Sequence, residues 1–246
     1  MERGLYIAMN GAKQIMQAQA STANNLANVN TTAFRADLEQ FRSQPVFGPG
    51  YASRVYAMTE RPGVDLSAGA LETTGRDLDV AINGEGWIAV QAEDGSEAYT
   101  RAGDLHITEQ GQLLTGKGLP VIGNAGPIAV PPAQKLEIGT DGTISLVPQG
   151  GNTTVLAVVD QIKLVKPPKD QLQKGEDGLM RFAGEGNAAP SAEVKLVTGV
   201  LETSNVSAVE EMVRMIELQR HYEMQIKMMK TIEDNAAASA QIMRMG

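Results

Sequence analysis

The chain has 246 residues, which is enough for one or two domains with a sizeable hydrophobic core. Its formal net charge of −8 at pH 7 argues against nucleic acid or an anionic membrane surface as the main partner. Because the chain has no cysteine, disulfides, zinc–thiolate sites and thiol nucleophiles are excluded.

A long helix is predicted over residues 1–35. Apolar and small side chains recur there at spacings of three and four, which gives a heptad-like stripe. From Gln14 to Phe34 the sequence has no charged residue, whereas a helix that faces solvent normally carries Lys, Glu and Arg. An uncharged polar surface fits a helix surrounded by other protein, although an ordinary core helix of one domain would also explain it. The stripe includes Leu5, Ala12, Ile15 and Leu26.

Glycine and proline separate both ends of the chain from its middle. All eleven prolines lie between Pro45 and Pro190. Residues 36–77 are therefore expected to form an extended connector that contains Pro and Gly, and residues 78–199 a β-rich domain.

Within this β-rich domain the hydrophobic period changes to two at Leu78, and Asn83-Gly84 supplies a turn. Short strands with frequent turn signals indicate an antiparallel β domain, in which Trp87 is expected in the core. Residues 174–190 are expected to be a loop-rich return segment. Strands are expected at 78–82, 87–90, 98–101, 105–108, 112–115, 119–122, 136–138, 143–147, 155–159 and 161–165.

A second long helix is predicted over residues 200–246, since Val200 to Met245 contains neither Gly nor Pro. Ser207 followed by Glu210 is typical of a capping box at a helix start. Seven of the twelve methionines follow residue 211, and flexible thioethers suit contacts with several different neighbours. The apolar stripe, spaced by three and four, is too extensive for one partner helix, so it predicts coiled-coil pairing with the N-terminal helix and further association. The stripe includes Met212, Tyr222, Ile226 and Met229, and Ile216 widens it.

The sequence shows no set of residues typical of an enzyme. The sequence GEGWIA at 84–89 matches the glycine pattern of a dinucleotide-binding site. However, a predicted strand follows where the helix of such a site must begin. The two histidines, His106 and His221, fall on different predicted elements. We therefore expect no catalysis, no cofactor and no metal site. No cleavable signal peptide and no run near the ~18 apolar residues of a membrane span is visible.

Three groups of motifs resemble signatures of the bacterial flagellar axial proteins, the family of rod, hook and hook-associated proteins. ANNLAN at 23–28 with Phe34 resembles the N-terminal signature, and SNV at 204–206 with EEM at 210–212 resembles the C-terminal one. LDVAINGEGW at 78–87 and YTRAG at 99–103 are similar to the central segment of the rod and hook members. The start MER and the triplet GWI at 86–88 resemble the proximal rod members more than the distal ones.

The two predicted terminal helices and the β-rich middle together indicate an α+β protein. The resemblance implies that its subunits stack helically into the driveshaft that crosses the periplasm and transmits torque to the hook. The paired terminal helices would form the inner tube, and the β domain would face outward. The implied partners are other copies, other rod proteins and the flagellar type III export apparatus, which needs no cleaved signal peptide. Assembly and helix pairing are expected to involve Leu5, Ala12, Ile15, Asn24, Asn25, Leu26, Asn28, Phe34, Asn205, Val206, Met212, Ile216, Tyr222, Ile226 and Met229.

Two alternatives remain at this point. One is a distal rod or hook-type protein of the same family. The other, from a different class, is a soluble ligand-binding β domain whose helices form a stalk.

Overall fold

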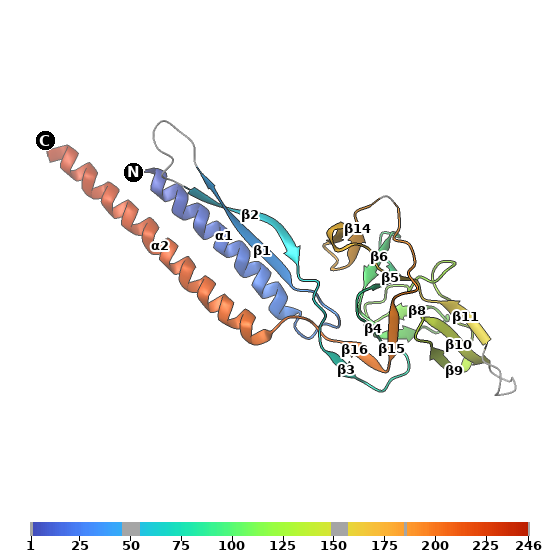
Figure 1. Ribbon diagram of the computed structural model, residues 1–246. Coiled ribbons are helices and arrows are strands. Elements are labelled where there is room, and N and C mark those ends of the chain that lie inside the picture. The colour runs from blue at the N-terminus through green and yellow to red at the C-terminus, as the bar shows by residue number, and fades with distance from the viewer. Residues whose placement is uncertain (1, 46–54, 149–156, 185, 246) are drawn as a thin grey trace. The chain divides into compact units, whose positions relative to one another are not determined.

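The computed structural model describes residues 2–45, 55–148, 157–184 and 186–245 (Figure 1). The chain separates into two compact units. Unit 1 comprises Met1–Val29, Ala36–Asp65 and Val206–Gly246, and unit 2 comprises Asn30–Arg35 and Leu66–Asn205. The described residues form two long α-helices and many antiparallel strands, so the prediction of an α+β fold with a β domain is confirmed.

Unit 1 contains both helices, α1 (Glu2–Ala27) and α2 (Ala208–Met245). They lie side by side and run in opposite directions, as Figure 1 shows. A Cβ atom on Gly4 would lie 3.4 Å from Ile232 of α2, and one on Gly11 would lie 3.2 Å from the Gln225 side chain. The small residues of α1 therefore allow α2 to approach closely.

The helix ends differ from the predicted boundaries at 35 and 200. α1 ends at Ala27, where the Asn28 side chain and backbone N–H both donate to the Asn24 carbonyl, at 2.9 and 3.2 Å. Asn side chains compete for backbone hydrogen bonds in this way, which ends the helix early. α2 begins only after Ser207, whose hydroxyl accepts a hydrogen bond from the Glu210 N–H at 3.4 Å.

Unit 1 also contains a β-hairpin in the segment that was expected to be an extended connector. β1 (Asp37–Pro45) and β2 (Val55–Val64) pair antiparallel, with a bulge between Leu38 and Gln40. The hairpin packs against α1. The middle of the expected connector, residues 46–54, lies outside the described residues.

Unit 2 consists mainly of small antiparallel sheets. Its described strands are β3 (Leu71–Thr73), β4 (Val80–Asn83), β5 (Trp87–Gln91), β6 (Glu97–Thr100), β7 (Leu105–Ile107), β8 (Leu113–Thr115), β9 (Ala133–Ile138), β10 (Thr143–Pro148), β11 (Ala157–Gln161), β12 (Leu164–Val165), β13 (Leu172–Lys174), β14 (Met180–Phe182), β15 (Lys195–Thr198) and β16 (Val200–Glu202). The largest sheet has the strand order β12-β5-β6-β14-β13, a second has β11-β10-β9, and the other described strands form the pairs β15-β4, β16-β3 and β7-β8.

Most of the predicted strands overlap β4 to β12. The strand expected at 119–122 is replaced by isolated bridges, such as Leu114 to Pro120 and Val90 to Val121. Pro120 has no N–H to donate to a longer ladder. Residues 155 and 156 of another expected strand lie outside the described residues. The predicted return loop over 174–190 contains β14, and β3, β13, β15 and β16 were not predicted.

The core of unit 2 has two parts. The larger surrounds Ile88, Leu105 and Ile144, and the smaller surrounds Trp87 and Tyr99. Trp87 is 7% exposed, so its predicted place in the core is confirmed.

Candidate functional site

The apolar side chains that α1 buries within unit 1 are mainly small. Ala8, Ala12 and Ala18 are buried, and Ile15 is half-buried. On α2 the least exposed positions are spaced by four and three, which is the spacing of a helix seam. Between residues 211 and 232 they are Glu211, Met215, Leu218, Tyr222, Gln225, Met229 and Ile232.

One buried polar contact links three elements of unit 1. The Asn25 amide donates to the Asp37 carbonyl at 3.0 Å and to Oε1 of Glu211 at 3.2 Å. The Asp37 N–H donates back to Oδ1 of Asn25 at 2.9 Å. Because Asn25 is only 2% exposed, these contacts fix the end of α1 against the starts of β1 and α2.

Most of the large apolar side chains that remain exposed belong to unit 1. Among the described residues, 17 of the 19 strongly exposed ones lie there, and Leu71 and Val158 are the two in unit 2. On α2 the first three turns expose Val209, Val213 and Ile216 on the side opposite the residues that contact α1. The others are Leu5, Tyr6, Met9, Met16, Leu38, Phe41, Val55, Met58, Met212, Met224, Ile226, Met228, Ile242 and Met243.

The structure places the expected assembly residues in different environments. Ala12 and Asn25 are buried in unit 1, whereas Leu5, Asn24, Met212, Ile216 and Ile226 are exposed there. The half-buried ones are Ile15, Leu26, Asn28, Phe34, Asn205, Val206, Tyr222 and Met229. In the contact with α1, Glu211 and Gln225 take the places that the predicted stripe assigns to Met212 and Ile226.

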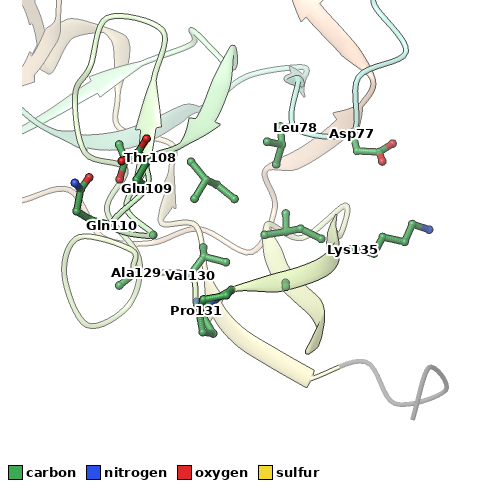
Figure 2. A pocket seen from close by; sticks show the side chains of 14 residues that line it. Asp77, Leu78, Thr108, Glu109, Gln110, Ala129, Val130, Pro131 and Lys135 are labelled. Atoms are coloured by element: carbon green, nitrogen blue, oxygen red, sulfur yellow. The ribbon is translucent and has the colours of Figure 1, made fainter. Parts of the chain in front are cut away.

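Unit 2 has a cavity of about 760 Å³ beside β9 (Figure 2). Leu78, Val130 and Leu136 contribute apolar surface to it. Asp77 and Lys135 are the charged side chains on one side of its lining, as Figure 2 shows. This is the feature that a ligand-binding β domain would use.

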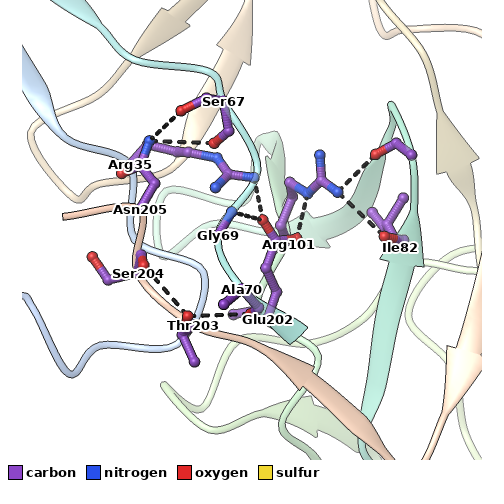
Figure 3. Close-up of polar contacts among 12 residues, drawn as sticks. Arg35, Ser67, Gly69, Ala70, Ile82, Arg101, Glu202, Thr203, Ser204 and Asn205 are labelled. Carbon is purple, nitrogen blue, oxygen red and sulfur yellow. Dashed lines mark hydrogen bonds and ion pairs between the residues drawn. The ribbon is translucent and has the colours of Figure 1, made fainter. Parts of the chain in front are cut away.

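A buried ionic cluster in unit 2 is centred on the Glu202 carboxylate (Figure 3). Nη2 of Arg35 donates to Oε1 of Glu202 at 2.6 Å, and Nε of Arg101 donates to Oε2 at 2.8 Å. The Gly69 N–H also donates to Oε1, at 2.9 Å. We call Arg35, Arg101 and Glu202 the Glu202 cluster.

The charges of the Glu202 cluster do not cancel, since two guanidinium groups share one carboxylate. Burial lowers the pKa of Arg101, and the charge of Arg35 adds to this lowering while Glu202 opposes it. Both guanidinium carbons lie 6.0 Å from the centroid of the Trp87 ring, close enough for a cation–π attraction to offset part of the cost. Among the described residues, Nε and Nη1 of Arg35 find no hydrogen-bond partner.

The described part of the chain shows no metal site, because no three His, Asp or Glu side chains are grouped there to hold an ion. Its helices also lack a segment long and apolar enough to cross a membrane. His106 lies in unit 2 and His221 in unit 1.

Sequence reasoning did not find the Glu202 cluster. Arg101 lies within the YTRAG motif, but a motif does not say which residues its side chains meet. The signal that was available is the occurrence of Arg35 and Glu202 directly beside the N- and C-terminal motifs.

Three family models match successive parts of the chain. A model described as flagella basal body rod protein matches residues 5–35. The flagellar hook protein FlgE/F/G D1 domain matches residues 81–146, and the flagellar basal body rod FlgEFG protein C-terminal matches residues 197–242.

Similar proteins cover the whole chain. The flagellar basal-body rod protein FlgF of Escherichia coli K12 is 42% identical over 100% of both chains. FlgF of Salmonella typhimurium LT2 is 41% identical, also over 100% of both. The flagellar basal-body rod protein FlgG of Bacillus subtilis 168 is 32% identical over 95% of this chain and 96% of its own.

Proposed function

This chain belongs to the family of flagellar basal-body rod proteins, which are structural subunits of the basal body, and on this premise we propose that it polymerises helically through its terminal helices as a proximal rod subunit. In this role it transmits torque from the motor toward the hook. The proximal assignment is supported by 42% and 41% identity to two FlgF proteins over the full length, against 32% to 35% to FlgG proteins.

The observation that carries the polymerisation proposal is the exposed apolar surface of unit 1. Monomeric soluble proteins rarely leave large apolar patches in water, and larger patches usually mark interaction sites. Heterologous contacts that do not close into a ring generate filaments. Neighbouring subunits would therefore cover Val209, Val213 and Ile216.

Within one subunit we infer that α1 and α2 pair as an antiparallel coiled coil. The support is the four-three spacing of the least exposed residues of α2, together with the small residues of α1 that face it. Asn24, Asn28, Phe34, Asn205 and Val206 would then fix the ends of the helix pair. Unit 2 would form the outer part of the rod.

The remaining parts of the role follow from family membership. The partners are further copies and other rod proteins, and the location is the part of the basal body that crosses the periplasm. Delivery would use the flagellar type III export apparatus without a cleaved signal peptide. The role requires no catalysis and no contact with nucleic acid.

A pair of matched substitutions tests polymerisation. Val209 is 67% exposed in unit 1 and Val158 is 69% exposed in unit 2, so Val209→Asp and Val158→Asp make the same change at equal exposure. An Asp in the first turn of α2 is favoured by the helix dipole, so the subunit should still fold. We expect Val209→Asp to abolish filaments at high protein concentration and swimming in a complemented strain, and Val158→Asp to leave both intact.

Equal filament formation by the two variants would contradict the proposal. Light scattering and negative-stain electron microscopy measure the filaments, and circular dichroism checks the helix content. An unmodified chain that stays monomeric at high concentration would favour a ligand-binding role instead.

A further inference from the structure

We propose that the Glu202 cluster is a mechanical junction. It joins the segments of unit 2 through which the chain passes between the two units, and it anchors them to the β core of unit 2. The inference rests on the proposed function only for the source of the force. Torque that reaches unit 2 through any of these segments would be passed to its β core at this cluster.

The chain passes between the units four times, after residues 29, 35, 65 and 205. Three segments of unit 2 adjoin these passages, namely 30–35, 66–70 and 202–205. A force on either helix or on the hairpin therefore reaches unit 2 through one of these three segments.

Backbone hydrogen bonds join the three segments to each other. The Ala33 N–H donates to the Glu202 carbonyl at 2.8 Å, and the Thr203 N–H donates to the Ala70 carbonyl at 2.8 Å. The Asn205 N–H donates to the Phe34 carbonyl at 3.3 Å. The segment 202–205 thus lies between the other two.

The Glu202 carboxylate ties the same segments together a second time. Its oxygens accept from Arg35 in the first segment, from Gly69 in the second and from Arg101 in the β domain. Nη2 of Arg101 continues to the carbonyls of Gly84 at 2.8 Å and Ile82 at 3.3 Å, at the end of β4 (Figure 3). A single buried carboxylate therefore connects all three segments to the β core.

Two further contacts close the junction. Lys174 of β13 lies 4.2 Å from the centroid of the Phe34 ring and donates to the Arg35 carbonyl at 2.9 Å. A Cβ atom on Gly69 would lie 2.0 Å from the Thr203 carbonyl oxygen, so only glycine fits between these two segments. The segments are therefore held by close packing as well as by charge.

Stability alone does not account for this arrangement. A buried ion pair usually adds little compared with well-packed apolar residues of similar volume, because both charges must be desolvated. What the cluster adds is connection between distant parts of the chain. Each of the three matching family models contributes one member, Arg35, Arg101 and Glu202 respectively.

Hydrogen exchange on the full-length chain tests whether the three segments open as one. Arg101→Met removes the link to the core but leaves Arg35 and Glu202 as a balanced pair, and Arg101 touches none of the backbone bonds between the segments. We expect the amides of Ala33, Gly69 and Thr203 to exchange faster together, by about tenfold or more, since hydrogen bonds to charged groups are among the stronger ones.

Lys163→Met is the matched control, because it removes a cation from another poorly exposed pair of unit 2, with Glu97 at 2.7 Å. It should accelerate exchange only near the start of β6 and β12, which adjoin this pair. Arg101→Lys, which keeps the charge, should give a smaller acceleration and serves if Arg101→Met does not fold. Acceleration confined to the surroundings of residue 101 would overturn the proposal.

Force spectroscopy gives a second readout. The absence of native cysteine allows pulling handles at Ala27→Cys and Lys117→Cys, which are both exposed positions. With the junction intact, unit 2 should extend in one event, whereas Arg101→Met should add an early, short extension at lower force. Identical traces would contradict the junction. Neither measurement needs filaments. The junction can therefore be contradicted while polymerisation is supported, and polymerisation can be contradicted while the junction is supported.

Discussion

The two units bury very different side chains. Among the described residues, the buried apolar ones of unit 1 are all alanines, Ala8, Ala12, Ala18 and Ala36. Unit 2 buries large side chains completely, including Ile88, Leu105 and Ile144. Because burial yields roughly 25 cal/mol per Å² of apolar surface, unit 2 gains far more from its own core. Unit 1 leaves its larger apolar side chains on the outside.

The charges are divided in the same way. Unit 2 has 18 Asp and Glu against 11 Lys and Arg, a formal charge of −7, whereas unit 1 has 11 against 10. A nearly neutral surface with exposed apolar side chains allows close contact between like copies, and net charge opposes it. Unit 2 thus buries its large apolar side chains within a single copy, whereas the surface of unit 1 is suited to contact with neighbouring copies.

The largest expected effect contrasts one substitution in the two units. Ile88→Ala in unit 2 should lower the free energy of unfolding by about 2–5 kcal/mol, because it leaves a cavity in a packed core. Ile216→Ala in unit 1, at a position 53% exposed, should change it by less than about 0.5 kcal/mol in the dilute chain. Urea unfolding followed by Trp87 fluorescence and helix circular dichroism measures both. Equal losses of unfolding free energy in the two variants would contradict this difference between the units.

A smaller effect tests the polar contact that orders unit 1. Asn25→Ala should cost about 1–3 kcal/mol, because it leaves the Asp37 N–H and the Glu211 carboxylate without this partner. Asn24→Ala, at the exposed neighbouring position, is the control and should be near neutral. Faster exchange of the Asp37 N–H in the first variant alone is the expected signature. No difference between the two would mean that the contact does not order the unit.

The periodic elements were predictable from the sequence. The helical spacing of α2, its Ser207 cap and the short apolar runs of β4 and β5 are local signals that the fold preserves. The hairpin was missed because Pro45 and Pro62, which lie within its two strands, argue against a β-ladder.

The contact face of α2 was predicted only in part. Apolar residues lie on several sides of this helix, so periodicity alone cannot say which side meets α1. In the structure the polar side chains of Glu211 and Gln225 face α1. The Asn25 amide donates a hydrogen bond to Glu211, and the small Gly11 leaves room for Gln225. The Glu202 cluster depends on three residues distant in sequence, and no local pattern reports such a meeting.

The smallest expected effect concerns a carboxylate in unit 1. Burial raises the pKa of Glu39 above its ordinary value of 4.5, Asp37 adds to the rise, and Arg214 opposes it. Oε2 of Glu39 is buried and has no hydrogen-bond partner in the part of the chain that the structure describes. As the pH rises through 4.5, the unfolded chain loses this proton before the folded chain does. The contribution of Glu39 to stability therefore falls over this window and stays lower at neutral pH.

Glu39→Gln removes this buried charge and should stabilise unit 1 at pH 7, by less than about 0.5 kcal/mol for a half-buried position. At a pH well below 4.5 the gain should vanish, because the native carboxyl is then protonated in both states. Glu223→Gln, at an exposed site on α2, is the control and should show no such dependence on pH. Helix circular dichroism during urea unfolding at the two pH values measures the difference. A gain that persists at low pH would show that the charge of Glu39 is not its cause, and that the sparse core of unit 1 tolerates a buried carboxylate.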